Sequence, residues 1–430
     1  MFWDESQETL PHEALADLQM ERLGSMLARL KESVPFYQHT LRDILPKDIR
    51  TLDDIRQLPF TTKDDLRDHY PFGLLAVPLT EVVRLHASSG TTGRATVVGY
   101  SRKDMDLWAD VMARTMKAGG VTPADVVHNA YGYGLFTGGL GFGLGAETVG
   151  AATVPVSSGM SKRQLQLLED LGATVLCCTP SYGLALLDSA EASGIDWKKR
   201  MRTRIGFMGA EPWTDSMRQE ISARMGIEAF DIYGLSEVIG PGVAVECSAH
   251  DGLHIWDDHF LPEVIDPESG EPASEGEVGE LVFTTLTKEA LPLLRYRTRD
   301  RVRLKTEPCS CGRTSVRMSK VFGRTDDMLI IRGVNVFPSQ IEAALLAVDG
   351  LAPHYLILVD RQEKRLDDIE VRVEPTATTN IDREHLAATA RDRVQQTLGI
   401  KVGLRVVEPG SLERSQGKAV RVVDRRAAED

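Results

Sequence analysis

Hydroxyl side chains and glycine are concentrated in one short run of the sequence, Ser88-Ser89-Gly90-Thr91-Thr92-Gly93. Glycine lets backbone N–H groups close around an anion and hydroxyls donate further hydrogen bonds, so the run is typical of a phosphate-binding loop. It is not a Walker loop, because Arg94 follows it in place of a lysine and the next residues are strand-like rather than helical. A hairpin turn of serine and glycine is the alternative interpretation.

A second candidate site interleaves aromatic rings with glycine, in the segment Tyr131-Gly132-Tyr133-Gly134-Leu135-Phe136-Thr137-Gly138-Gly139. So many glycines disfavour a regular helix, but they allow the backbone and the flat rings of Tyr131, Tyr133 and Phe136 to approach a small planar ligand. A flexible aromatic loop is the alternative. The segment therefore predicts a pocket for a small aromatic compound.

Two further motifs follow apolar runs that we predict to be strands, Gly209-Ala210-Glu211-Pro212 and Asp231-Ile232-Tyr233-Gly234-Leu235-Ser236-Glu237. Open α/β sheets bind ligands at strand ends. Tyr233 could stack on a base, Ser236 could contact a phosphate and Glu237 could hold magnesium. A turn followed by a helix cap is the alternative for each motif.

Asp300 is a further candidate, because it stands among arginines in the sequence. It either forms ion pairs with them or accepts hydrogen bonds from ribose hydroxyls.

Sulfur ligands for a metal come from Cys309-Ser310-Cys311-Gly312 and Cys247. With His254 they would form a tetrahedral Cys3His zinc site, and His250 competes for the histidine position. The spacing is Cys-x-Cys rather than Cys-x2-Cys, and three free thiols in loops are the alternative. Such a zinc ion would be structural and would take no part in catalysis.

Composition limits the kinds of partner and location. The 430 residues are 42% hydrophobic and carry a formal net charge of -13 with both signs interspersed, which argues against a nucleic-acid-binding surface. The N-terminal residues contain no basic and apolar leader, and no run of about 20 apolar residues predicts a membrane span. Five cysteines, an odd number, indicate a reducing compartment. We therefore expect a cytoplasmic protein.

The candidate sites need a scaffold that brings strand ends together. Between residues 102 and 230, short apolar runs alternate with amphipathic stretches, which predicts a mainly parallel sheet covered by helices. We expect helices at 13–33, 102–118, 161–171, 182–191 and 214–225, and strands at 126–130, 151–156, 174–178, 205–208 and 227–230.

We expect an α/β fold in two domains. The large N-terminal domain spans residues 1–323 and includes a β-rich part at about 243–322, where short β-like runs are separated by Gly, Pro, Asp and Glu. The small domain, residues 324–430, has the α+β pattern, with helices at 339–347 and 382–398 between strands.

These motifs occur in the order typical of one family, and the chain resembles the adenylate-forming acyl-CoA synthetases along essentially its whole length. The resemblance rests on the motifs above, on Arg295-Tyr296-Arg297-Thr298-Arg299-Asp300, and on the most specific stretch, which runs from Gly323 to Pro338. The family's last motif matches Glu413-Arg414-Ser415-Gln416-Gly417-Lys418-Ala419-Val420-Arg421.

The resemblance implies a ligase that uses ATP, magnesium and coenzyme A, first forming an acyl-adenylate and then a thioester. It assigns the run from Ser88 to Gly93 to the β- and γ-phosphates, Ser236 to the α-phosphate and Glu237 to magnesium. Asp300 and Arg324 would meet the ribose. The adenine site would be formed by Gly209, Ala210, Glu211, Asp231, Tyr233 and Gly234.

The resemblance also makes Lys418 the best candidate for the catalytic cation, and it places at Asp326 the hinge about which the small domain rotates. Tyr131, Tyr133, Phe136 and Gly209 would line the acid pocket, and their rings favour an aryl acid. We expect phenylacetate, with hydroxyphenylacetate or indoleacetate as alternatives. A module that loads a carrier protein and a nucleotide-binding protein without catalysis are less favoured, because Lys418 and Glu237 are both present. A homodimer is possible.

Overall fold

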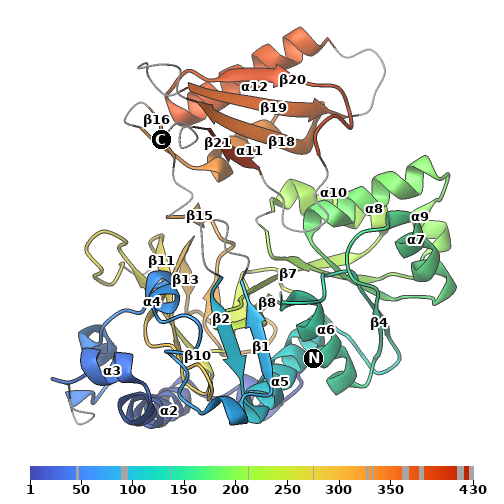
Figure 1. Ribbon diagram of the computed structural model, residues 1–430. Coiled ribbons are helices and arrows are strands. Elements are labelled where there is room, and N and C mark those ends of the chain that lie inside the picture. The colour runs from blue at the N-terminus through green and yellow to red at the C-terminus, as the bar shows by residue number, and fades with distance from the viewer. Residues whose placement is uncertain are drawn as a thin grey trace.

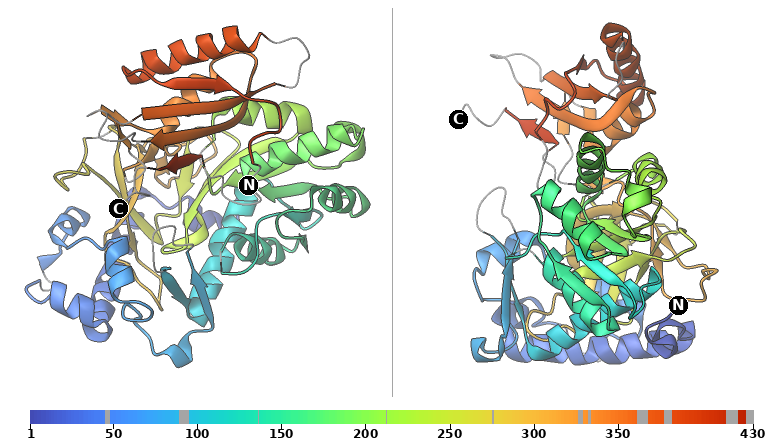
Figure 2. Two further views of the ribbon diagram at one scale, coloured as in Figure 1. Left: turned by 45° about the horizontal axis from the view of Figure 1, so that its top comes forward. Right: turned by 90° about the vertical axis from the view of Figure 1, so that its right-hand side faces the viewer.

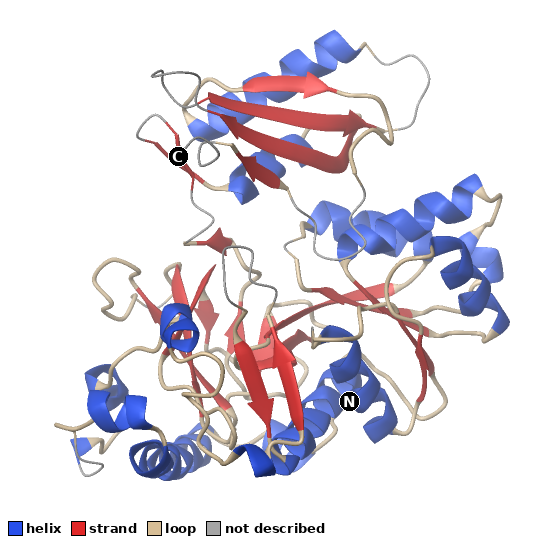
Figure 3. Cartoon of the chain, viewed as in Figure 1, coloured by secondary structure: helices blue, strands red, loops and turns tan. Residues whose placement is uncertain are grey.

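The computed structural model describes residues 1–44, 48–88, 95–135, 137–211, 213–274, 276–325, 329–331, 334–360, 368–376, 382–413 and 421–425. Figure 1 shows the fold as a large N-terminal domain and a small C-terminal domain, drawn in orange and red, that lies at one end of it. The predicted α/β fold is therefore confirmed, and Figure 3 shows that helices and strands are mixed in both domains.

The large domain is organised around a mixed sheet, which among the described residues contains nine strands. Strands β7, β6, β5, β3 and β4 are parallel to one another, whereas β8, β9, β14 and β13 add an antiparallel half that begins with the pairing of β8 to β7. The strands in sheet order are β13 (Leu304–Lys305), β14 (Arg317–Met318), β9 (Leu253–Ile255), β8 (Ile239–Glu246), β7 (Glu228–Leu235), β6 (Ile205–Gly209), β5 (Val175–Cys178), β3 (Val126–Asn129) and β4 (Ala152–Pro155).

Both faces of the parallel half are covered by helices, as the uninterrupted apolar strands require. Strand β5 shows this directly, because successive side chains of a strand point to opposite faces. Val175 and Cys177 join the core formed with α5 (Arg102–Ala118) and α6 (Gly138–Val149). Leu176 and Cys178 join the core formed with α7 (Ser161–Asp170), α8 (Pro180–Ala192) and α10 (Asp215–Met225).

Helix α6 differs from the expectation for the aromatic segment, because the helix already begins at Gly138. Its glycines serve close packing against α5. A Cβ at Gly145 would lie 2.8 Å from Cβ of Met112, and one at Gly141 would lie 2.9 Å from the ring of Trp108. The cost of glycine in a helix is thus offset by contacts that a larger residue would prevent.

Four strands between residues 260 and 324 form a second, antiparallel sheet, whereas β13 and β14 of the same stretch join the nine-stranded sheet, so the predicted β-rich part is β-rich but divided between two sheets. The strands of the second sheet pair in the order β10 (Phe260–Ile265), β11 (Gly279–Thr285), β12 (Tyr296–Val302) and β15 (Gly323–Arg324). A further hairpin, β1 (Arg84–Ala87) with β2 (Val97–Tyr100), flanks the serine, threonine and glycine run. That run therefore connects two antiparallel strands.

The small domain has its own apolar core, which the described residues from Leu329 to Leu404 form with partly buried Val422 packed against it. Its main sheet pairs β20 (Gly403–Val406), β19 (Asp368–Pro375), β18 (Leu351–Asp360) and β21 (Val422–Asp424). The hairpin β16 (Leu329–Ile331) with β17 (Val334–Val336) precedes α11 (Pro338–Leu346), and α12 (Arg383–Leu398) packs against α11 and β20. The right-hand view of Figure 2 shows this domain as a separate lobe.

The remaining helical segments lie in the large domain. The helices predicted there correspond to α2, α5, α7, α8 and α10, each within two residues of its predicted bounds, whereas α6 was not predicted. Of the described helices, none is both long and apolar enough to cross a membrane. The segments not yet given are α1 (Glu5–Glu8), α2 (His12–Ser33), α3 (Pro35–Thr40), α4 (Lys63–Asp68) and α9 (Trp197–Arg200), together with two short 3-10 helices at Leu52–Gln57 and Leu79–Glu81.

Candidate active site

The Glu237 carboxylate lies in a buried polar pocket at the turn between β7 and β8. Its side chain is 6% exposed and receives a hydrogen bond from the Thr96 hydroxyl at 3.3 Å. Lys63, the first residue of α4, places its ammonium 3.3 Å from the same carboxylate oxygen. Thr96 also bonds to the Ser88 hydroxyl. The start of the serine, threonine and glycine run and Glu237 are therefore joined through one side chain.

Two lysines at this pocket did not emerge from the sequence. Lys63 sits in a helix start that the capping pattern predicts, but nothing local indicates that its ammonium reaches Glu237. Lys288 donates to the Glu237 backbone oxygen at 3.1 Å and lies over the Tyr100 ring at 4.6 Å. Burial lowers the pKa of Lys288 to about 8. An isolated lysine between Thr287 and Glu289 carries no sequence signal for such a position.

The start of α6 comes within reach of Ser236. The hydroxyls of Thr137 and Ser236 lie 3.2 Å apart, and the Tyr100 hydroxyl donates to the Ser236 backbone oxygen at 3.5 Å. The end of the aromatic segment is thus beside the turn that carries Glu237. We conclude that Ser236 joins these two parts of the site.

The end of β6 packs tightly against β7. A Cβ on Gly209 would meet the Ile232 backbone oxygen at 2.4 Å, so only glycine fits there. Ala210 follows in the left-handed region, with φ of 67°, and the Glu211 carboxylate accepts a hydrogen bond from the Ser181 N–H at 2.7 Å. Burial, reinforced by the nearby Glu246 carboxylate, raises the pKa of Asp231 to about 7.

Strand β7 continues through Leu235, whereas the predicted strand ended at Phe230. The continued strand directs Tyr233 to Asp300 on β12, and the Tyr233 hydroxyl donates to that carboxylate at 2.5 Å. Arg324 pairs across the second sheet with Asp300 and donates to its other oxygen at 2.9 Å. The Asp300 carboxylate is therefore held by two donors, Tyr233 and Arg324, that come from separate strands.

The aromatic segment is more buried than a flexible loop would be. Tyr131 is 3% exposed and its ring stacks on Phe142 with centroids 5.1 Å apart. The Tyr133 hydroxyl accepts a hydrogen bond from the Asn129 amide at 2.9 Å, and burial raises the pKa of Tyr133 to about 12. Tyr131 therefore acts in packing, while the half-buried Tyr133 remains placed to meet a ligand.

The small domain reaches the end of β6. Arg421 pairs with Glu342 of α11, and its guanidinium lies over the Tyr355 ring at 4.8 Å. Glu211 acts electrostatically on both Arg421 and Glu342, so this pair lies beside the adenine motif. A cavity of about 460 Å³ is lined by residues of both domains, among them Trp213 and Phe337. The motif that contains Glu211 therefore lies near the contact between the two domains.

Several predicted site residues fall outside the described part of the chain. These are Ser89, Gly90, Thr91, Thr92, Gly93, Phe136, Asp326 and Lys418.

The predicted zinc ligands are brought together by the fold. Cys247, His254, Cys309 and Cys311 place their ligand atoms within 4.8 Å of one another. His250, the alternative histidine, instead faces Glu246 at 3.3 Å and Glu228 at 3.2 Å. The structure thus favours His254.

Comparison with known proteins identifies the family. Residues 48–286 match the family model for the AMP-binding enzyme, and residues 333–426 match that for the AMP-binding enzyme C-terminal domain. A phenylacetate-coenzyme A ligase of Thermus thermophilus is 48% identical, over 99% of this chain and 100% of its own length. A phenylacetate-coenzyme A ligase of Escherichia coli is 49% identical over 97% of each chain.

Comparison with solved structures also finds acyl-CoA ligases. A 2-hydroxyisobutyryl-CoA ligase in the postadenylation state, in complex with 2-HIB-AMP, is 30% identical and has a TM-score of 0.92, covering 99% of this chain and 93% of its own. The structure of that ligase with 2-HIB-AMP and CoA in the thioesterification state has the same identity and coverage but a TM-score of 0.74. The present chain thus matches the postadenylation arrangement more closely. By sequence and by structure, the chain belongs to the AMP-binding enzyme family.

Proposed function

We propose that this protein joins phenylacetate to coenzyme A in two steps. In the first, a carboxylate oxygen of phenylacetate attacks the α-phosphorus of ATP and the bond to pyrophosphate breaks, giving phenylacetyl-adenylate. In the second, the deprotonated thiol of coenzyme A attacks the acyl carbon and AMP leaves. The observation that carries the proposal is the match, at 48–49% identity over 97–99% of the chain, to four phenylacetate-coenzyme A ligases.

The described contacts support separate roles for the residues at the strand ends in binding the ribose, the adenine and the phosphates of ATP. We assign Asp300 and Arg324 to the ribose, because the carboxylate is held by two donors that leave its position fixed. The adenine would lie between the end of β6 and Tyr233. Ser236 is assigned to the α-phosphate and the run from Ser88 to Gly93 to the departing pyrophosphate, since Ser88 and Glu237 share Thr96 as a partner.

Magnesium fits the chemistry of this pocket. The buried Glu237 carboxylate already pairs with a cation, the Lys63 ammonium, and hydroxyl oxygens of Thr96 and Ser88 adjoin it. Carboxylate and other oxygen ligands are those that magnesium prefers. We therefore assign Glu237 as its protein ligand. When bound, magnesium neutralises phosphate charge and orients the reacting groups.

Lys418 is assigned to the charge that develops at the α-phosphate and the attacking carboxylate. Arg421, three residues further along the chain, lies beside Glu211 at the end of β6, which supports delivery of this segment to the nucleotide site. We place the hinge at Asp326 and the domain boundary just after β15, one residue later than the predicted boundary between residues 323 and 324, because Arg324 pairs with Asp300 of the large domain. The closer match to the postadenylation structure supports an arrangement suited to the first step.

The test is Lys418→Ala, with Lys401→Ala as a control in the same domain. We expect pyrophosphate release that depends on phenylacetate to fall roughly 100- to 1,000-fold, the usual effect of removing one stabilising charge from a transition state. Thioester formation from supplied phenylacetyl-adenylate should change little, because the family rotates Lys418 away for that step. Unchanged pyrophosphate release would refute the role of Lys418.

The acid is tested separately with the unaltered enzyme. Release of AMP that depends on coenzyme A should be fastest with phenylacetate in a panel that includes hydroxyphenylacetate, indoleacetate and alkyl acids. A preference for another acid would refute the proposed substrate without affecting the adenylation chemistry. The cytoplasmic location and the homodimer stay predictions.

A further inference from the structure

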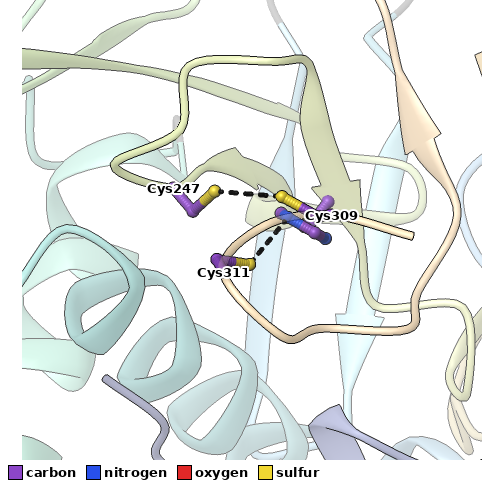
Figure 4. A group of neighbouring side chains, drawn as sticks. Cys247, Cys309 and Cys311 are labelled. Carbon is purple, nitrogen blue, oxygen red and sulfur yellow. Dashed lines mark hydrogen bonds between the residues drawn. The ribbon is translucent and has the colours of Figure 1, made fainter. Parts of the chain in front are cut away.

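Two loops and one strand of the large domain bring three thiols and one imidazole to a common point. Cys247 follows β8, His254 lies in β9, and Cys309 and Cys311 belong to the loop between β13 and β14. Figure 4 shows the three sulfurs directed toward one small region. The cluster involves none of the residues that we assign to the reaction, so its purpose needs a separate explanation.

The spacing of these atoms is that of a tetrahedral metal site. For zinc with bonds of about 2.3 Å to sulfur and about 2.05 Å to nitrogen, two sulfurs lie about 3.8 Å apart and a sulfur and a nitrogen about 3.6 Å apart. Here the sulfurs of Cys247 and Cys309 are 3.7 Å apart, and Cys311 Sγ is 3.4 Å from His254 Nε2. A disulfide would need about 2.05 Å between sulfurs.

The surroundings of the cluster are those of a bound cation with thiolate ligands. The Ser315 hydroxyl lies 3.0 Å from His254 Nδ1, which fixes the ring with Nε2 toward the thiols. The Arg313 guanidinium donates to Cys311 Sγ at 3.7 Å, and its side chain is 1% exposed. Three thiolates and a neutral imidazole around a divalent ion leave one negative charge, and the Arg313 guanidinium, which also pairs with the Glu8 carboxylate, places a positive group beside it.

We propose that Cys247, His254, Cys309 and Cys311 bind one Zn²⁺ in a closed structural site. Soft sulfur ligands with one imidazole select zinc over magnesium or calcium. Because the protein supplies all four ligands, no position is left for water or substrate, as is usual for structural rather than catalytic zinc. The inference is independent of the proposed activity.

The site would fasten the N-terminal segment to the large domain. Arg313, two residues after Cys311, donates to the Glu8 carboxylate at 2.7 Å and to the Met1 backbone oxygen at 2.6 Å. Thr314 donates to the Leu10 backbone oxygen at 2.7 Å. A metal that fixes the loop of Cys311 therefore also fixes residues 1–10.

The experiment measures metal in the full chain purified without chelator. We expect about one zinc per chain in the wild type, loss to background in Cys311→Ser and His254→Gln, and no change in Cys177→Ala, which removes a buried cysteine outside the cluster. Cys311 is only partly buried, so circular dichroism should show that its variant folds. Its N-terminal segment should be cleaved faster by protease than that of the wild type.

Cobalt provides a second measurement on the same protein. Replacing zinc by cobalt should give the intense visible absorption of a tetrahedral ion and the near-ultraviolet bands of thiolate ligands, both absent from Cys311→Ser. A folded, metal-free protein whose thiols all react with a thiol reagent would overturn the proposal. So would a mass lower by two hydrogens, which indicates a disulfide, or zinc that persists in both ligand variants.

Discussion

Replacing Gly209 by alanine tests whether the contact between β6 and β7 positions the nucleotide site. The two strands are parallel and Gly209 pairs with Ile232. The added Cβ would lie 2.4 Å from the Ile232 backbone oxygen and 2.6 Å from its Cγ1 atom. The Ile232 oxygen belongs to the backbone and cannot rotate away from the added Cβ as the end of a flexible side chain could. The backbone of one of the two strands must therefore shift.

The size of the effect follows from the overlap. Ordinary contact begins at 3.4 Å, so the strands must separate by about 1.0 Å at this position, the difference between 3.4 and 2.4 Å. Overpacking of this kind costs about 1–3 kcal/mol of stability. Because a displacement of about 1 Å in a positioning element costs about 100-fold in rate, kcat/KM for ATP should fall by about that factor.

The assay combines thermal unfolding with pyrophosphate release at varied ATP concentration. Gly24→Ala is the matched control, because Gly24 lies inside α2 and an added Cβ would meet nothing within 4 Å. Alanine should stabilise that helix by about 0.5–1 kcal/mol and leave kinetics unchanged. Wild-type stability and ATP kinetics in Gly209→Ala would refute the reasoning, since the strands would then tolerate the methyl group.

Two further substitutions test the electrostatics of the site. Tyr233→Phe removes the 2.5 Å hydrogen bond to Asp300, and kcat/KM for ATP should fall about tenfold; an unchanged value would contradict the ribose assignment. In Asp231, burial raises the folded pKa to about 7, above the unfolded value of about 3.9. The folded state therefore keeps a proton that the unfolded state has lost, and stability falls between about pH 4 and pH 7. Asp231→Asn removes this loss, so its melting temperature relative to wild type should rise over that range, and a constant difference would contradict the shift.

The elements that the sequence predicted well are those whose signals are local. Helix α5 was expected at its observed bounds, and the structure shows local signals at both of its ends, since Ser101 and Asp104 form a capping box and Gly119 follows the last turn. Helix α6 was not expected, because its glycines score poorly for a helix. Their benefit lies in contact with Met112 and Trp108, which only the packed α5 supplies.

The sequence alone determined the family chemistry of this protein. Side-chain type and order alone led to the predicted roles of the serine, threonine and glycine run, the carboxylate of Glu237 and the lysine of the last motif. These motifs are readable because each is built within a few consecutive residues.

Only the tertiary structure decided which residues meet. Tyr233 and Asp300 are 67 residues apart in the chain, and Cys247 and Cys309 are 62 apart. Lys63 and Lys288 reach Glu237 from separate segments, and His254 rather than His250 joins the thiols. Contacts between residues so far apart in the chain depend on the order and register of the strands. Order and register are fixed when both faces of the sheet are buried, and no local sequence pattern contains that information.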